Sequence, residues 1–134
     1  MIFIADTGFI LARWSKTATR RRWAERYFSQ FSPPFISADA VLIEAGYRLG
    51  VSELAPRLLR DGDYVSEISL TEDADSLLWL LRKYQDREMD LADACIVLLS
   101  DRFRNATVLT VDRADFSVYR RRDGSKVPCD FGPQ

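Results

Sequence analysis

The chain has 134 residues, a formal net charge of −1 at pH 7, and 47% hydrophobic and 29% charged residues. This length and composition are typical of a globular protein, so we expect residues 1–134 to form a single domain. The sequence has no histidine and only two cysteines, which excludes a Ser-His-Asp triad, a Cys-His pair and any zinc site with histidine ligands. An enzyme of this composition must act through carboxylates, hydroxyls, Arg or Lys, or a metal held by oxygen ligands.

No apolar stretch approaches the roughly 18 residues of a transmembrane helix. The apolar N-terminus lacks a basic leading region and contains Asp6, so we do not expect a signal peptide. Cys95 and Cys129 are then predicted to be reduced thiols. These features together predict a cytoplasmic protein.

Strand and helix patterns alternate along the N-terminal half. The run at residues 2–5 is β-branched and aromatic, as in a buried parallel strand. Pro33 and Pro34 end a helical pattern with an aromatic face. The predicted elements are a strand at 2–5, helices at 8–14 and 18–31, a strand at 35–36, a helix capped by Ser37 or Asp39 and running to Leu49, and a helix ending at Arg60.

The same alternation continues to the C-terminus. The predicted elements are a strand at 65–70, a helix at 71–85, a strongly apolar helix at 90–104 closed by Asn105, a strand at 107–111, and one or two short edge strands within 117–131. Short connections between such elements indicate an α/β fold with a mostly parallel sheet of four to five strands. Helices are expected to cover both faces of this sheet.

Two of the predicted strands are followed by an aspartate. Asp6 comes after IFIA, and Asp112 comes after TVLTV. In a parallel sheet both carboxylates leave the same edge, where open α/β folds bind ligands. Each aspartate alone also suits a helix N-cap, but the repeated pattern favours a shared site.

Glu44 borders the buried stripe of its predicted helix, because it lies three residues after Val41. A carboxylate in that position needs a partner, since an unpaired buried charge is costly. Arg48, four residues further on, is one candidate partner. A cation shared with other carboxylates is the other.

Asp90 and Asp93 lie at the start of the predicted 90–104 helix. Asp90 suits the N-cap with Asp93 at N3, in a variant of the capping box. Asp93 is followed by the apolar run ACIVLL, so its carboxylate lies where the helix enters the core. Asp93 is therefore also a candidate functional acid, whereas Cys95 in the same run is interpreted as a core residue.

Four carboxylates are thus candidates for one site: Asp6, Glu44, Asp93 and Asp112. If they converge, their like charges require a counter-charge. Oxygen ligands without His or Cys favour Mg²⁺ or Mn²⁺ over zinc, and one or two such ions activate water toward a phosphodiester. Thr7 and Thr110 are placed to orient a carboxylate or a water through their hydroxyls.

Basic residues gather in two parts of the chain, and most of them are arginine. The arginine fork binds phosphate bidentately, which suits a nucleic-acid backbone. A solvated surface with salt bridges is the alternative. The candidate phosphate-binding residues are Arg13, Arg20, Arg21, Arg22 and Arg113.

The segments that carry these acids resemble PIN-domain ribonucleases. They are Ala5-Asp6-Thr7-Gly8, VLIEAGYRL around Glu44, DLADA at 90–94 and TVDRADF at 110–116. In size and order they are most similar to the VapC-like toxins of prokaryotic toxin–antitoxin pairs. The resemblance extends over about residues 2–120. Each motif alone is weak, but four acids in the right order are together fairly specific.

The resemblance implies a three-layer α/β/α sandwich and cleavage of single-stranded or looped RNA that depends on Mg²⁺ or Mn²⁺. It also implies a homodimer and a cognate antitoxin that inhibits the nuclease. By this resemblance Asp6, Glu44, Asp93 and Asp112 match the metal-binding acids, Thr7 matches the hydroxyl residue after the first acid, and Asp90 and Asp115 match accessory acids.

Three alternatives stay open. A receiver-like domain needs an adjacent acidic pair and a late lysine, whereas Asp6 stands alone and no lysine lies between Lys83 and Lys126. A PIN-like nuclease of RNA processing without an antitoxin is the second alternative. A non-catalytic PIN-like scaffold is the third. No role is predicted for residues 120–134.

Overall fold

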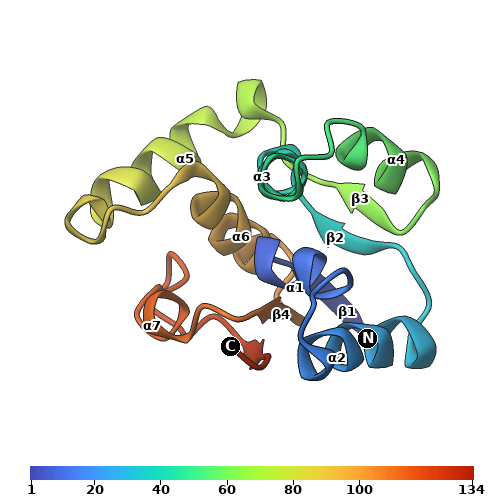
Figure 1. Cartoon of the computed structure of the whole chain (residues 1–134). Coiled ribbons are helices and arrows are strands. Elements are labelled where there is room, and N and C mark those ends of the chain that lie inside the picture. Colours follow the sequence, from blue (N-terminus) through green and yellow to red (C-terminus); the bar gives the residue numbers. More distant parts are fainter.

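We describe the fold from a computed structural model that covers all 134 residues. Figure 1 shows the arrangement of the elements. In chain order they are β1 (Ile2–Ala5), α1 (Thr7–Ala12), α2 (Ala18–Gln30), β2 (Phe35–Ser37), α3 (Asp39–Leu49), α4 (Leu54–Arg60), β3 (Tyr64–Ser66), α5 (Leu70–Lys83), the 3₁₀ turn η1 (Gln85–Arg87), α6 (Leu91–Arg102), β4 (Ala106–Thr110), α7 (Arg113–Phe116) and β5 (Cys129–Phe131). No helix combines the length and the apolar character that a membrane span requires.

The five strands form one sheet in the order β3-β2-β1-β4-β5, and every pair is parallel. This confirms the predicted α/β class, with β5 as the expected edge strand. The central strand β1 pairs with β2 on one side and with β4 on the other. Strand order therefore reverses between β1 and β4, and their carboxyl ends border the crevice in which such folds bind ligands.

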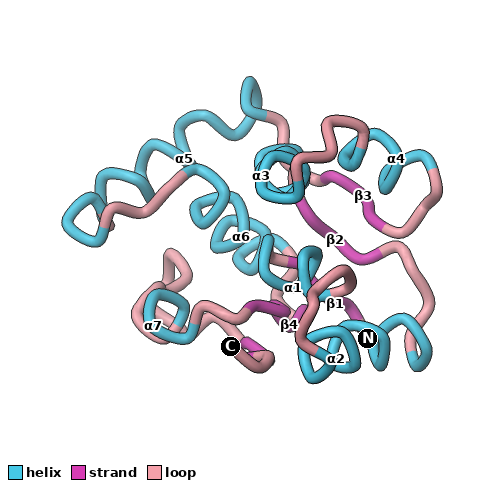
Figure 2. The backbone as a smooth tube through the Cα atoms, viewed as in Figure 1, coloured by secondary structure: helices cyan, strands magenta, loops and turns pink.

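Helices cover both faces of the sheet. Successive side chains of β1 point to opposite sides of the sheet, so both sides have apolar side chains that pack against helices. Phe3 packs its ring against Tyr27 and Phe31 of α2, with ring centroids 5.1 and 4.6 Å apart. On the other face α6 contacts β1 and β4. Figure 2 shows the strands between α2 on one side and α3 and α6 on the other. The predicted three-layer sandwich is confirmed.

Some predicted element ends are wrong for identifiable reasons. The strand predicted at 65–70 ends at Ser66, because the Ser69 hydroxyl accepts a hydrogen bond from the Glu72 backbone N–H and starts α5. The helix α3 is not capped by Ser37 or Asp39, since its N-cap is Ala38. The Ser37 hydroxyl instead donates to the Ala5 carbonyl at 2.9 Å and joins β2 to β1.

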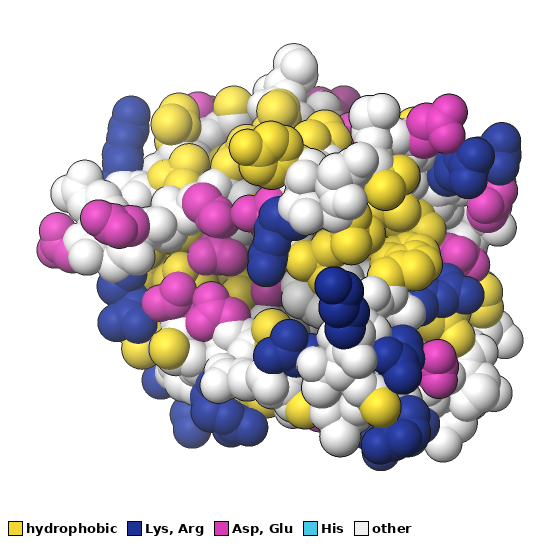
Figure 3. Space-filling model, in the orientation of Figure 1, with side chains coloured by type: hydrophobic (Ala, Val, Ile, Leu, Met, Phe, Trp, Pro, Cys, Tyr) yellow, Lys and Arg dark blue, Asp and Glu magenta, His cyan; other side chains and the backbone are white.

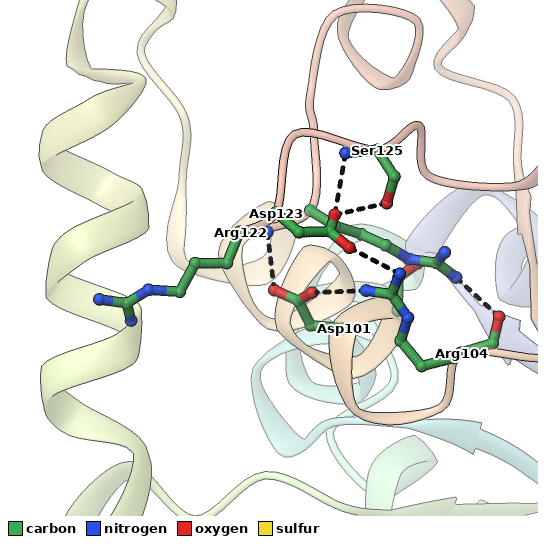
Figure 4. A network of polar contacts seen from close by, with 7 residues as sticks. Asp101, Arg104, Arg122, Asp123 and Ser125 are labelled. Carbon is green, nitrogen blue, oxygen red and sulfur yellow. Dashed lines mark hydrogen bonds and ion pairs between the residues drawn. The ribbon is translucent and has the colours of Figure 1, made fainter.

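The segment after α7 folds back onto the end of α6 (Figure 4). Arg104 contacts Asp101 at 3.4 Å and Asp123 at 2.7 Å, and the Arg122 backbone N–H donates to Asp101 at 3.0 Å. Arg121 is only 6% exposed and donates to the Ser100 hydroxyl at 3.1 Å and the Arg104 carbonyl at 2.9 Å. These bonds fix residues 117–126 against the helix that carries Asp93.

Candidate metal centre

Asp6 directly follows β1 and is almost fully buried, with 6% of its surface exposed. It stands at the N-cap position of α1, but its side chain makes no cap hydrogen bond. Its Oδ2 accepts a hydrogen bond of 2.6 Å from the Thr110 hydroxyl at the end of β4. The capping interpretation is therefore wrong for Asp6, whose carboxylate is held toward the neighbouring strand.

Asp112 follows the end of β4, where it caps α7 and belongs to a group of acidic side chains. Its Oδ1 accepts from the Asp115 backbone N–H at 3.0 Å and caps α7. Carboxylate oxygens of Asp93, Asp112 and Asp115 also all lie within 4.8 Å of one another. The structure thus places Asp115, predicted as an accessory acid, in the tightest acidic group of the chain.

Asp90 and Asp93 have different roles at the start of α6: Asp90 caps the helix, whereas the Asp93 carboxylate does not. Asp90 is the N-cap of α6, and its Oδ1 accepts from the Asp93 backbone N–H at 2.8 Å. The Asp93 side chain does not complete a capping box. Its Oδ2 accepts a hydrogen bond of 3.0 Å from the hydroxyl of Tyr119. Asp93 therefore joins α6 to the C-terminal segment at the acidic edge of the sheet.

Glu44 is half-buried on α3 and accepts a hydrogen bond of 2.6 Å from the Thr7 hydroxyl. It forms no ion pair with Arg48, so the first of its two candidate partners is not used. Thr7 and Thr110 each donate to one of the predicted metal-binding acids, as expected. The two threonines thus orient carboxylates that come from different layers of the fold.

The electrostatics of these acids show that they share one environment. Burial, together with the charges of Asp112 and Glu44, raises the pKa of Asp6 to about 6, although the Thr110 hydrogen bond lowers it. Burial and then the charges of Asp6 and Asp90 raise the pKa of Asp93 to about 8. Burial also raises the pKa of Asp112. Each ionised acid therefore makes the next ionisation more costly.

A divalent cation fits this donor set. All of the donors are oxygens, which suit hard cations such as Mg²⁺ and Mn²⁺. The cluster has an excess of negative charge, and Arg87, which pairs with Asp115 at 2.9 Å, offsets only part of it. A bound cation would offset the repulsion that raises these pKa values. The compact group of donors is Asp93, Asp112 and Asp115. Asp6 and Glu44 lie outside this group, and Asp6 acts on Asp93 through its charge.

The predicted phosphate-binding arginines lie in different environments. Arg13 pairs with Asp63 at 3.2 Å and stacks over Phe28 at 4.2 Å, so its charge is used within the fold. Arg21 donates to the Ser15 carbonyl at 2.7 Å, and Arg113 lies 4.5 Å above the Phe131 ring. Arg22 is exposed, and Arg20 lines a cavity.

Figure 3 shows the charge distribution on the face that holds the site. Asp and Glu side chains gather over α6 and α7, and Lys and Arg side chains border them on the side of α1 and α2. The acidic cluster therefore has a basic margin on the same face, a pattern that suits a substrate carrying phosphates.

The five-stranded parallel sheet, the helices on both faces and the carboxylates at the reversal of strand order define a PIN-like α/β protein. No model of a known protein family matches the chain. The chain is 30% identical over 129 residues to Ribonuclease VapC26 of Mycobacterium tuberculosis, an alignment that covers 92% of this chain and 96% of the relative. The chain therefore belongs to the VapC-like family of PIN-domain proteins.

Proposed function

We propose that the chain is an endoribonuclease that hydrolyses RNA phosphodiester bonds with Mg²⁺ or Mn²⁺, and that it is the toxin of a toxin–antitoxin pair. One observation carries the proposal. Asp6 after β1, Asp93 on α6 and Asp112 after β4 act on one another through their charges, in a chain that is 30% identical to a VapC ribonuclease. The same similarity supports RNA as the substrate and an antitoxin as a partner. The homodimer stays a prediction.

The chain's own residues have distinct tasks in this proposal. Asp6, Glu44, Asp93 and Asp112 would hold the cation, which when bound would activate water and offset charge on the phosphoryl oxygens. Thr110 keeps the Asp6 carboxylate turned toward β4 through its 2.6 Å hydrogen bond. Thr7 does the same for Glu44. Asp90 fixes the first turn of α6, and Asp115 lies beside Asp112 at the rim.

Cleavage of a structured RNA pool by antitoxin-free protein tests the proposal. The protein is incubated in Mg²⁺, in Mn²⁺ or in EDTA, and Asp6→Asn and Asp93→Asn variants are assayed beside it. We expect cuts that need the metal, leave 3′-hydroxyl and 5′-phosphate ends, and are lost in both variants. Folded wild-type protein that cuts no RNA in either metal would contradict the proposal and favour a non-catalytic scaffold.

A further inference from the structure

A cavity of about 500 Å³ lies beside the chain segments that carry Asp6 and Asp112. We propose that it holds one nucleotide of the RNA strand next to the scissile phosphate, with the base against Trp14 and a phosphate on Arg20 and Arg48. The inference rests on the proposed function, because it assigns a subsite to the proposed substrate. The volume lies within the roughly 300–1,000 Å³ that small-molecule sites occupy.

The position of the cavity follows from two of its lining residues, Gly8 and Val111. Gly8 is two residues after Asp6, and Val111 directly precedes Asp112. A Cβ atom on Gly8 would lie 2.5 Å from Val111 Cγ2, so a glycine is needed for α1 to lie this close to the end of β4. The cavity is therefore bordered by the same two chain segments that carry Asp6 and Asp112. A nucleotide linked to the reacting phosphate must occupy space that adjoins the site in this way.

Charge selects the kind of ligand that the cavity accepts. Arg20 and Arg48 both line it, and neither forms an ion pair. The Nε of Arg20 is buried and has no hydrogen-bond partner. An unsatisfied buried donor is costly, so a ligand that accepts a hydrogen bond there stabilises the structure. Two unpaired guanidinium groups in one cavity select an anion, and phosphate matches their fork geometry.

The other walls are apolar and aromatic. Leu11, Leu49 and Val111 line the cavity together with Trp14, which is 45% exposed. Nucleobases stack on aromatic side chains in proteins that bind single-stranded RNA. An acidic protein segment would satisfy the two arginines, but its carboxylates would bring no ring to stack on Trp14, which has the Arg13 guanidinium 6.0 Å from its ring centroid. The combination of an aromatic ring with two free arginines therefore favours a nucleotide.

Binding of RNA without cleavage tests this assignment. Every protein carries Asp93→Asn, and the probe is a fluorescein-labelled single-stranded RNA of about 12 nucleotides and random sequence, followed by anisotropy in Mg²⁺. We expect Arg20→Gln and Arg48→Gln each to weaken binding several-fold and to lower the salt slope by about 0.7. We expect Trp14→Ala to weaken binding about 5- to 100-fold with little change in the salt slope.

Two matched variants control for charge and for ring loss outside the cavity. Arg26→Gln removes the same charge from an exposed position on α2, and Trp79→Ala removes a ring from α5. Both are expected to stay within about twofold of the parent protein. Equal losses for Arg20→Gln and Arg26→Gln, or no loss for Trp14→Ala, would overturn the assignment and leave a protein segment as the occupant.

The failure of this assignment can be told apart from the failure of the proposed function. If wild-type protein cuts RNA but the three cavity variants bind RNA normally, the nuclease stands and the nucleotide site is wrong. If the cavity variants lose RNA binding but the wild-type protein cuts nothing in Mn²⁺, the RNA site stands and the nuclease proposal is wrong. Thermal unfolding of each variant confirms that it is folded.

Discussion

The hydroxyl of Tyr119 donates a hydrogen bond of 3.0 Å to Asp93, although the two residues are 26 positions apart in the chain. Tyr119 is fully buried, and its ring packs edge-on against Tyr84 and Phe116 with centroids 5.0 and 5.1 Å away. The C-terminal segment thus supplies a fixed donor to a carboxylate of the proposed metal site. Partners of this kind set the orientation of metal ligands.

Tyr119→Phe is expected to weaken Mn²⁺ binding by about tenfold, because the ring still fills the core while the Asp93 carboxylate loses its fixed donor. Calorimetric titration with Mn²⁺ measures this directly. Tyr84→Phe is the matched control, since the Tyr84 hydroxyl accepts from the Arg120 backbone N–H at 2.9 Å and does not contact an acid. Equal Mn²⁺ affinity of Tyr119→Phe and wild type would show that the hydrogen bond does not position the ligand.

The metal-free protein should lose stability as the pH rises. The folded-state pKa values of Asp6 and Asp93 are raised to about 6 and about 8, above the usual range near 4. A carboxyl group whose pKa is higher in the folded state than in the unfolded state stabilises the fold at a pH below its unfolded pKa. This stabilisation is lost as the pH rises through the folded-state pKa. We therefore expect the Tm in EDTA to fall between about pH 4 and pH 8.

Asp93→Asn is the control for this fall in Tm, because it removes one of the two carboxyl groups whose pKa is raised. In EDTA at pH 8.5 its Tm should exceed that of wild type by a few degrees, and the difference should vanish near pH 4. Thermal melts over this pH range measure both effects. A lower Tm for Asp93→Asn at pH 8.5 would mean that the acid serves the fold and not a cation site.

Thr110→Val should shift the pH dependence of metal binding upward. The Thr110 hydroxyl stabilises the ionised form of Asp6, so its removal raises the pKa of Asp6 further. Metal binding needs the ionised acid and should reach its midpoint at a correspondingly higher pH. Thr107→Val on the same strand should leave the midpoint unchanged, and Mn²⁺ titrations from pH 5 to 9 compare the two.

Arg121→Met is expected to destabilise the fold by about 2 kcal/mol, because it leaves the buried Ser100 hydroxyl and the Arg104 carbonyl without their donor. Urea denaturation measures the change in the free energy of unfolding. Arg122→Met is the neighbouring control. Arg122 is exposed and stacks over Trp79 at 4.7 Å, so its loss should cost less than about 1 kcal/mol. Equal losses would mean that Arg121 does not anchor the segment.

Local sequence patterns predicted most of the strands and helices, and they predicted that Asp6 and Asp112 each follow a buried parallel strand. The apolar runs before Asp6 and Asp112 are short and β-branched, and the structure makes both of them parallel strands at the centre of the sheet. Parallel pairing then brings their carboxyl ends together. The threonine hydroxyls beside these acids each donate a hydrogen bond to a carboxylate, Thr7 to Glu44 and Thr110 to Asp6.

What the sequence could not predict depends on contacts between distant segments. The Tyr119 hydrogen bond to Asp93 requires residues 117–126 to fold back on α6, and nothing near Tyr119 in the sequence signals this. The ion pair between Arg87 and Asp115 likewise joins residues 28 positions apart. The hydrogen bond from Thr7 to Glu44, which joins residues 37 positions apart, is a third contact of this kind.

Calorimetric titration with Mn²⁺ shows whether carboxylates beside β1, α6 and β4 form one cation site. We expect saturable binding to wild type and a loss of affinity of at least tenfold in Asp93→Asn and in Asp112→Asn. Asp86→Asn, which removes an exposed acid from η1, should bind Mn²⁺ as wild type does. Absence of binding to folded wild-type protein, or unchanged affinity in both site variants, would contradict the account.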